Sequence, residues 1–305
     1  MKSSTFTFKD QDGVEIFVYK WEPDTAPKAV VQISHGMMEH AGRYVRFAEA
    51  LTKAGYIVYA NDQRGHGKTA KTSEEKGLMG QNGWNGAVAA LKALTDVIKK
   101  ENPNLPVFLF GHSWGSFMSQ NYIQEWGSGL KGAILSGTNG KQALVGIGSI
   151  IAKGEAKKKG YIAPGDKLDA LSFNGYNKRI KNPKTKSDWL SRDEKEVEKY
   201  VNDPDCGFVC KVGFFVELLT GLKKIWSKDQ EAKIPKDLPI YLFAGTEDPV
   251  SNYTKGIQAL IARYKKLGIK DLSYKFYEGG RHEMLNEINR EDVFKDVIAW
   301  LDGHL

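Results

Sequence analysis

One stretch decides the fold of this chain of 305 residues, Val107-Phe108-Leu109-Phe110-Gly111-His112-Ser113-Trp114-Gly115. Four apolar residues with high strand propensity lead directly into G-H-S-W-G, and a segment rich in helix formers follows over residues 116 to about 126. This order is typical of a nucleophile elbow, a sharp turn between a strand and a helix. Gly111 and Gly115 fit such a turn, because a side chain at either position would collide with the neighbouring strand or helix. The stretch therefore predicts that Ser113 is a nucleophile at a helix N-terminus, where negative charge is favoured.

Strands and helices alternate on both sides of the elbow. Beyond the elbow strand, the sequence predicts a hairpin of Thr5–Lys9 with Glu15–Trp21, and strands at Ala29–Ser34, Tyr56–Ala60, Gly132–Ser136, Pro239–Ala244 and Leu272–Tyr277. Helical spacing of apolar residues occurs at Tyr44–Ala54, Trp84–Lys100, Tyr253–Leu267 and Glu291–Leu301. This alternation predicts an α/β protein with a mostly parallel central sheet of about eight strands, flanked by helices.

The alternation stops in the middle of the chain. Residues 138–236 are rich in Lys, Gly, Asn and aromatic residues, and they include a helix candidate at Val212–Trp226. We expect this segment to form a helical cap inserted between core strands, while residues 1–137 and 237–305 form the α/β core. Because the insertion interrupts the sheet between two strands, the cap should cover the carboxyl edge, where sites in such sheets gather.

Composition and charge exclude several classes of function. The net charge is +7 with a pI near 9.1, and lysine-rich runs occur at 153–159, 178–186 and 223–233, but no nucleic-acid-binding motif accompanies them. Cys206 and Cys210 form a single C-x3-C, which is neither a zinc ligand set nor a disulfide scaffold. Since no secretion signal and no long apolar stretch are visible, we expect a cytoplasmic protein. We also expect no metal and no organic cofactor.

Reactive side chains follow the predicted strands at the points where these strands end. A serine hydroxyl becomes nucleophilic only when a base takes its proton. Of six histidines, His282 follows the last core strand, and triad partners in this type of fold follow the order serine, acid, histidine. Asp248 ends the preceding strand and is our candidate for the acid, with Glu247 as the nearest competitor. The predicted catalytic residues are therefore Ser113, Asp248 and His282.

Two backbone N–H groups are predicted to bind the oxyanion of an acyl-transfer intermediate. One belongs to Trp114, directly after the nucleophile, and the other to Met37, in the loop of residues 35–40 that follows a core strand. We call residues 35–40 the glycine loop, because Gly36 lets its backbone bend close to a substrate. Gly36 is therefore predicted to contact substrate.

Five motifs together resemble one known family. They are H-G-M-M-E-H-A-G-R-Y (His35–Tyr44), N-D-Q-R-G-H-G (Asn61–Gly67), G-H-S-W-G (Gly111–Gly115), G-T-E-D (Gly245–Asp248) and G-G-R-H (Gly279–His282). In this order the chain resembles the monoacylglycerol lipase and lysophospholipase branch of the α/β-hydrolase superfamily. The resemblance implies the same triad, the oxyanion donors Met37 and Trp114, and a helical cap with an acyl-chain tunnel. Met38 replaces the second glycine of the family's H-G-x-G-E-H and is expected to narrow the entrance, which leaves the preferred acyl length open.

The cap helix supplies candidates for acyl binding. We expect the apolar face with Phe214, Phe215, Leu218 and Leu219 to line a tunnel, although a Phe and Leu stripe of this kind also serves core packing. The cap's lysines indicate peripheral contact with an anionic membrane surface. Nothing in the sequence indicates an oligomeric state.

The predicted function is a serine carboxylic-ester hydrolase that acts on an acyl ester or monoacyl lipid, such as a monoacylglycerol or lysophospholipid, through an acyl-enzyme. The alternatives are a short-chain carboxylesterase, a peptidase or amidase of the S33 type, and, least favoured, a binding protein on the same scaffold. A binding protein of this kind usually lacks a triad member, whereas all three are present here.

Overall fold

The computed structural model describes residues 1–305 and contains one sheet of eight strands. Their bounds are β1 Lys2–Lys9, β2 Glu15–Glu22, β3 Ala29–Ser34, β4 Tyr56–Asn61, β5 Val107–His112, β6 Gly132–Ser136, β7 Ile240–Gly245 and β8 Leu272–Tyr277. The spatial order is β1-β2-β4-β3-β5-β6-β7-β8. Strands β3 to β8 pair in parallel, while β1 with β2 and β2 with β4 are antiparallel. The predicted α/β-hydrolase fold is thereby confirmed.

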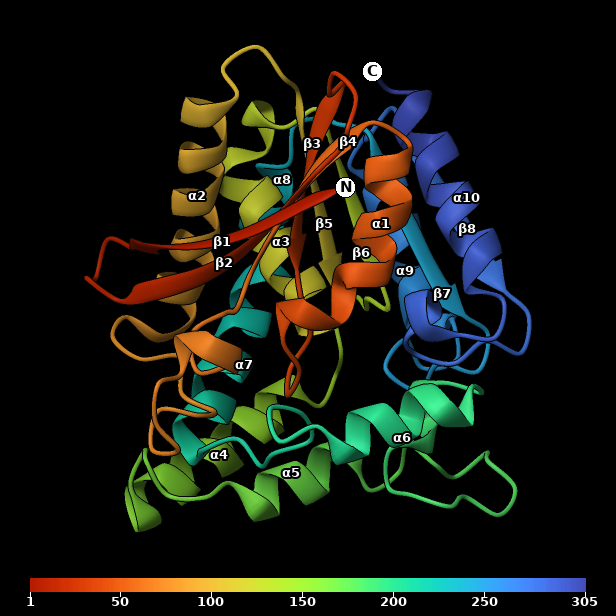
Figure 1. The fold of residues 1–305 in the computed structure, drawn as a ribbon. Helices are drawn as coiled ribbons and strands as arrows, with labels where there is room; N and C mark the ends of the chain where they lie inside the picture. Colours follow the sequence, from red (N-terminus) through yellow and green to blue (C-terminus); the bar gives the residue numbers. More distant parts are fainter.

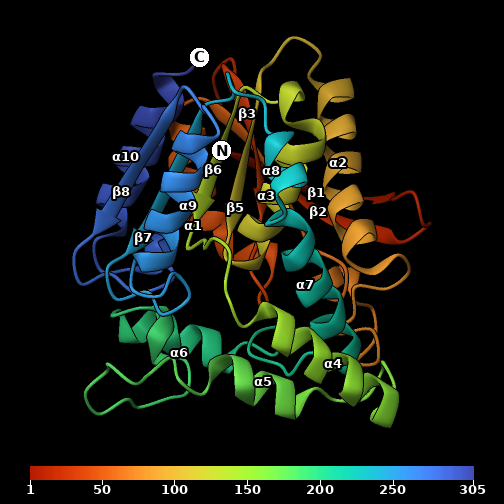
Figure 2. The same ribbon diagram turned by 180° about the vertical axis from the view of Figure 1, so that it is seen from behind.

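Helices cover both faces of the sheet (Figures 1 and 2). One face carries α1 (Val45–Lys53) and α10 (Arg290–Asp302), whose apolar residues share a core cluster with the sheet. The other face carries α2 (Gly83–Glu101), α3 (Trp114–Trp126) and α9 (Lys255–Lys266). Because both faces are covered, every residue of β3, β4, β5, β6 and β7 is buried.

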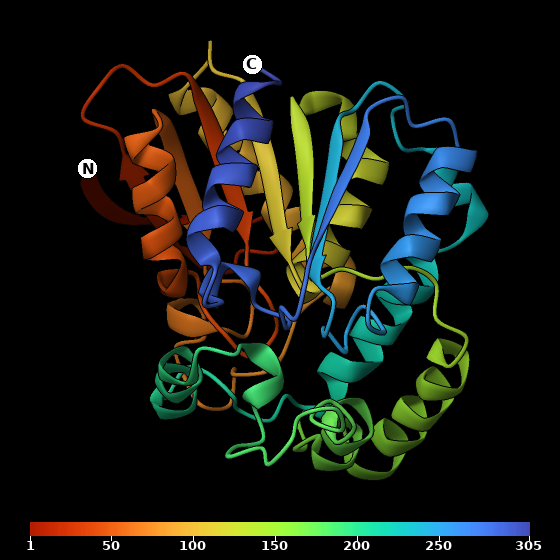
Figure 3. The same cartoon turned by 90° about the vertical axis from the view of Figure 1, so that its right-hand side faces the viewer.

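The segment between β6 and β7 leaves the sheet and lies below its carboxyl edge (Figure 3). It contains α4 (Val145–Lys159), α5 (Asp166–Phe173), α6 (Glu194–Asn202), α7 (Val212–Ile225) and α8 (Lys228–Ala232). Helix α7 runs back toward the core, and α8 packs against α3. The chain therefore rejoins the core layer before residue 236.

Short 3-10 helices connect several of these elements. They are η1 Ala41–Tyr44, η2 Gly67–Thr69, η3 Gly127–Gly129, η4 Asp188–Leu190 and η5 Met284–Asn286. Two predicted boundaries are wrong by more than one residue, because β1 begins at Lys2 and not at Thr5, and α9 begins at Lys255 and not at Tyr253. The three residues before it, Asn252, Tyr253 and Thr254, have left-handed φ angles of 52°, 54° and 70°, so they cannot extend a right-handed helix.

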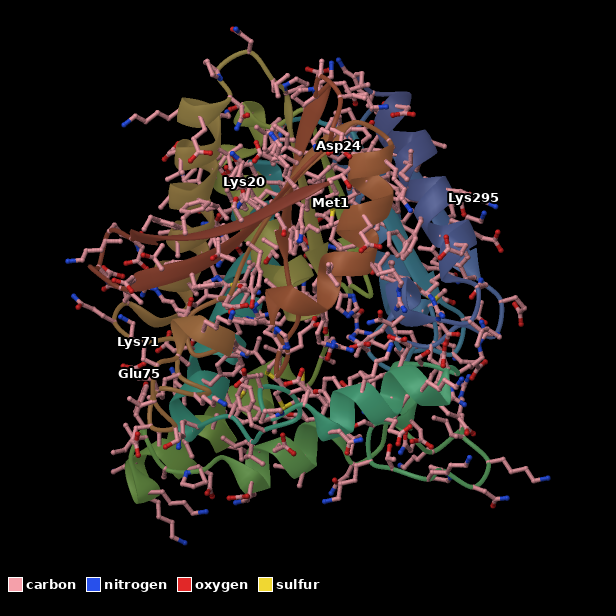
Figure 4. The ribbon with its side chains drawn as sticks, in the orientation of Figure 1. Met1, Lys20, Asp24, Lys71, Glu75 and Lys295 are labelled. Carbon is pink, nitrogen blue, oxygen red and sulfur yellow. The ribbon has the colours of Figure 1, made fainter.

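The antiparallel hairpin is fastened to the core by charge pairs. Arg64, from the predicted N-D-Q-R-G-H-G motif, pairs with Asp10 at 2.5 Å and Asp12 at 2.7 Å, and its side chain is buried. At the start of the chain, the Met1 amino group lies 2.6 Å from Asp24 Oδ2 (Figure 4).

No helix of the structure has the length and apolar character that crossing a bilayer requires.

Candidate active site

Ser113 stands at a strained turn between β5 and α3. Its backbone has φ 53° and ψ −122°, a conformation that non-glycine residues adopt only where the surrounding structure enforces it. Gly111 and Gly115 leave no room for side chains, since a methyl group at Gly111 would overlap Ser116 and one at Gly115 would overlap the carbonyls of β3. This packing turns the Ser113 side chain out of the sheet and places it at the N-terminus of α3.

The three predicted triad side chains lie within hydrogen-bonding distance of one another. His282 Nε2 is 2.8 Å from Ser113 Oγ, and His282 Nδ1 is 2.9 Å from Asp248 Oδ1. Asp248 and His282 are buried, at 0% and 1% exposure. Burial opposes the protonated imidazole, but the charge of Asp248 and its hydrogen bond outweigh this effect and raise the pKa of His282. The arrangement lets the imidazole accept the serine proton and lets the carboxylate stabilise the resulting imidazolium.

The competing candidates for the acid and the base do not belong to this hydrogen-bonded chain of side chains. Glu247 is largely exposed and lies 3.6 Å from Arg179, outside the hydrogen-bonded chain. His112 packs against His282 with ring centroids 4.7 Å apart, and its Nδ1 lies 3.2 Å from Ser136 Oγ. Burial and the neighbouring His282 lower the pKa of His112 to about 4, so its ring is neutral at pH 7.

Neutral histidines hold the glycine loop in place. His66 Nε2 accepts a hydrogen bond from the Met38 N–H at 3.1 Å, and His35 Nε2 accepts one from the Gln63 N–H at 3.0 Å. Burial lowers the pKa of both histidines to about 3, which keeps these ring nitrogens free to accept. Met38 adopts φ 59°, a left-handed conformation that costs free energy for a side chain of this size. The glycine loop is therefore held by His66 and Gln63 of the N-D-Q-R-G-H-G motif, which agrees with the structural role that the sequence predicts for this motif.

The loop lies tightly against the nucleophile. A methyl group at Gly36 would be 2.7 Å from Glu39 Oε1 and 3.2 Å from Ser113 Cβ, so a larger residue would displace one of them. Trp114 is the first residue of α3, and its N–H has no acceptor within the helix. The predicted oxyanion donors Met37 and Trp114 thus come from two segments that meet beside Ser113.

A buried ion pair network, which sequence reasoning missed, connects the glycine loop to the histidine loop. Arg43 donates to Glu39 Oε2 at 2.7 Å and to both carboxylate oxygens of Glu283 at 2.7 Å. Glu39 Oε1 accepts from the Gly36 N–H at 2.6 Å, and Glu283 directly follows His282. Burial of the Glu283 carboxylate acts to raise its pKa, but the charge of the Arg43 guanidinium outweighs this effect and lowers the pKa of Glu283 to about 2. One cation therefore fixes the backbones of both loops that surround the nucleophile.

The segment between β6 and β7 also holds His282 in place. The His282 N–H donates to the Trp189 carbonyl at 3.3 Å, and the Glu283 N–H donates to the Leu190 carbonyl at 2.7 Å. The Trp189 ring packs on the His282 imidazole with centroids 5.0 Å apart. The glycines before His282 predict a flexible approach, but in the structure the loop is fastened on both sides.

A cavity of about 730 Å³ opens beside Ser113, and 21 of its 35 lining residues are hydrophobic. Its lining includes Gly36, Met38, Phe215, Leu218 and Leu219. The prediction for Phe214 is wrong: its ring is fully buried and packs against His66 and Trp114 instead. Residues 215, 218, 219 and 222 of α7 line the cavity, whereas packing against His66 and Trp114 holds Phe214 away from it.

The Glu283 carboxylate should make the free energy of unfolding depend on pH. Its pKa is lowered in the folded chain, so its contribution to the free energy of unfolding is present above about pH 4.3, the pKa of a free glutamate. That contribution is lost as the pH falls toward the folded pKa of about 2. We expect Glu283→Gln to be less stable than wild type at pH 7 and to lose less further stability between about pH 4.5 and pH 2. Urea unfolding across this range measures the effect.

Glu291 provides the control for this measurement, since it is exposed on α10 and makes no ion pair. Glu291→Gln should follow the wild-type stability curve. A Glu283→Gln variant whose curve runs parallel to that of wild type would refute the proposed link between Arg43 and acid stability.

Comparison with known proteins places this geometry in a family. A family model described as serine aminopeptidase, S33, matches residues 25–289. The monoacylglycerol lipase of Mycolicibacterium smegmatis is 29% identical over 305 residues, which cover 99% of this chain and 98% of that protein. The monoglyceride lipase of Homo sapiens is 28% identical, with 95% and 88% covered.

A solved structure agrees with these sequences. The highly thermostable carboxyl esterase from Bacillus coagulans, crystallised in complex with glycerol, superposes with a TM-score of 0.92 at 30% identity, and 99% of each chain is covered. The resemblance inferred from the five motifs is therefore confirmed. With residues 25–289 of 305 matched by the family model, the chain belongs to the serine aminopeptidase S33 family of α/β-hydrolases.

Proposed function

We propose that Ser113, His282 and Asp248 form the catalytic triad of this chain, a serine ester hydrolase. The observation that carries the proposal is the hydrogen-bonded sequence Ser113 Oγ, His282 Nε2, His282 Nδ1 and Asp248 Oδ1, with distances of 2.8 and 2.9 Å. Ser113 attacks the ester carbonyl while His282 takes the hydroxyl proton and then passes it to the leaving alcohol. Water activated by His282 afterwards releases the acid from Ser113.

The oxyanion of each tetrahedral intermediate would be bound by the N–H groups of Met37 and Trp114. The glycine loop carries the first of these donors, and Arg43 and Glu39 hold that loop against Ser113. Donors that are fixed before the reaction stabilise developing charge without reorganisation, and one such donor contributes about 3 kcal/mol. Arg43 acts here as a positioning residue.

Monoacyl lipids are the substrates that the cavity fits best. Its volume of about 730 Å³ and its largely apolar lining suit one acyl chain, whereas a short acyl group would leave most of it unfilled. Phe215, Leu218 and Leu219 would contact this acyl chain. We propose residues 138–236 as the cap that covers it. The lipase activities named for the relatives support this substrate class.

An aminopeptidase reading is less well supported, although the family description names one. Recognition of a free amino terminus needs an unpaired carboxylate near the nucleophile. Glu39 and Glu283 are the carboxylates in the cavity lining, and Arg43 pairs with both. Neither is therefore available to a cationic substrate group.

Turnover of p-nitrophenyl esters tests the proposed nucleophile. Ser113→Ala should lower kcat by at least about 10⁴-fold, because removing the nucleophile leaves only binding and oxyanion stabilisation. Ser73→Ala, at an exposed serine, should keep the wild-type rate. Equal rates for wild type and Ser113→Ala would overturn the assignment. Monoacylglycerol should be hydrolysed in preference to both a C2 ester and an amino-acid anilide, and a preference for the anilide would favour the peptidase reading.

We further propose that the cap touches anionic lipid surfaces. Near the cavity mouth the cap exposes Leu144 at 71%, Ile147 at 58% and Ile150 at 74%. The last turn of α4 carries three consecutive lysines, 157–159. Exposed aliphatic residues beside lysines are the combination that binds an anionic bilayer surface.

Vesicle co-sedimentation tests this surface. Wild type should bind phosphatidylglycerol vesicles at low salt and release at high salt, because the lysine contribution is screened. Ile147→Glu with Ile150→Glu should weaken binding at least about tenfold while hydrolysis of a soluble short ester persists. The matched change Val201→Glu, at an exposed residue of α6, should bind like wild type. No binding of wild type at low salt would exclude the proposal.

A further inference from the structure

Three metal-ligating side chains meet where the glycine loop touches the cap. They are His40, at the end of the loop, and Asp203 and Cys206, which follow α6. Their ligand atoms all lie within 4.8 Å of one another, and His40 Nε2 is 3.0 Å from Asp203 Oδ2. The cluster is separate from the triad and from the cavity lining. Neither the proposed hydrolysis nor substrate binding uses it.

The backbone holds these side chains in place. The Cys206 N–H donates to the Asp203 carbonyl at 3.0 Å, forming a tight turn that brings both side chains together. The Asp205 N–H occupies Asp203 Oδ1 at 2.8 Å, which leaves Oδ2 directed toward His40. The Gly207 N–H donates to the Met38 carbonyl at 2.9 Å and fastens this turn to the glycine loop. The ligand positions are thus set by contacts that do not depend on a metal.

The set of atoms matches the preference of one ion. An imidazole nitrogen, a carboxylate oxygen and a sulfur are the ligands that Zn²⁺ takes, at about 2.0 to 2.3 Å. Ligand atoms that share a tetrahedral ion lie roughly 3.2 to 3.8 Å apart at these bond lengths. The 3.0 Å separation of His40 Nε2 and Asp203 Oδ2 is close to this range, and the Cys206 sulfur lies within 4.8 Å of both atoms.

Access and charge also favour a cation here. The side chains of His40 and Asp203 are 17% and 30% exposed, so an ion can enter from solvent and keep a water as its fourth ligand. The nearby Arg43 is neutralised by Glu39 and Glu283. Lys76 is likewise paired with Asp205 at 2.5 Å.

We propose that His40, Asp203 and Cys206 form a Zn²⁺ site that ties the cap to the glycine loop. The Cys206 thiol gives its proton to solvent and binds as the thiolate, and no redox change takes place. Cys210 takes no part, since it is fully buried outside the cluster. The C-x3-C spacing predicts no zinc site, and the proposed ligands are instead joined by the fold across 166 residues, from His40 to Cys206.

Metal binding to the full chain tests the proposal. After dialysis against a chelator, wild type should take up one equivalent of Zn²⁺ in competition with a chromogenic chelator. Cys206→Ser should bind at least about tenfold more weakly, and Cys210→Ser should bind like wild type. Co²⁺ should give a thiolate-to-metal charge-transfer band in wild type that Cys206→Ser lacks. Asp203→Asn, at a partly exposed position, provides a second variant in case Cys206→Ser fails to fold.

The outcomes separate this site from the triad. Zn²⁺ bound by His282 alone would leave the affinity of Cys206→Ser and Asp203→Asn unchanged and would give no thiolate band, which overturns the proposal. Uptake of no Zn²⁺ by wild type overturns it as well. Zn²⁺ should raise the thermal midpoint of wild type but not that of Asp203→Asn, because only the native site gains the binding free energy.

Discussion

The hydrogen bond between His282 Nε2 and Ser113 Oγ depends on the whole sheet. The two residues are 169 positions apart, and only the parallel arrangement of β5, β7 and β8 brings their strand ends to one edge. A serine hydroxyl that stands alone in water is a poor nucleophile, whereas one that shares its proton with a buried imidazole is a reactive one. The buried core strands therefore serve a single geometric purpose at their carboxyl ends.

Around this bond, ion pairs and backbone hydrogen bonds hold the loops in place. Arg43 joins Glu39, which accepts from the Gly36 N–H, to Glu283, which directly follows His282. The carbonyls of Trp189 and Leu190, in the segment between β6 and β7, accept hydrogen bonds from the N–H groups of His282 and Glu283. The proposed cap is consequently bonded directly to the histidine loop, and changes in its position would be transmitted to His282.

The local pattern of apolar residues was sufficient to predict the alternating strands and helices of the core. Apolar runs gave β3, β6 and β8 their observed bounds, and G-H-S-W-G between a strand and a helix located Ser113. Features that depend on orientation or on distant partners were not predictable in this way. The side of α7 to which Phe214 belongs is set by packing against His66, and the pairing of Arg43 with Glu283 joins residues 240 positions apart. The left-handed turn before α9 also has no signal in its apolar pattern.

Active-site labelling tests the central claim, that the fold makes one hydroxyl reactive, most directly. A fluorophosphonate, whose adduct imitates the tetrahedral intermediate, is applied to the folded chain, and the modified residue is mapped by mass spectrometry. The account predicts one phosphonyl group per chain, on Ser113, formed at least about 10³-fold more slowly in His282→Ala. Labelling of another residue, or labelling of Ser113 at the same rate without the imidazole, would contradict it.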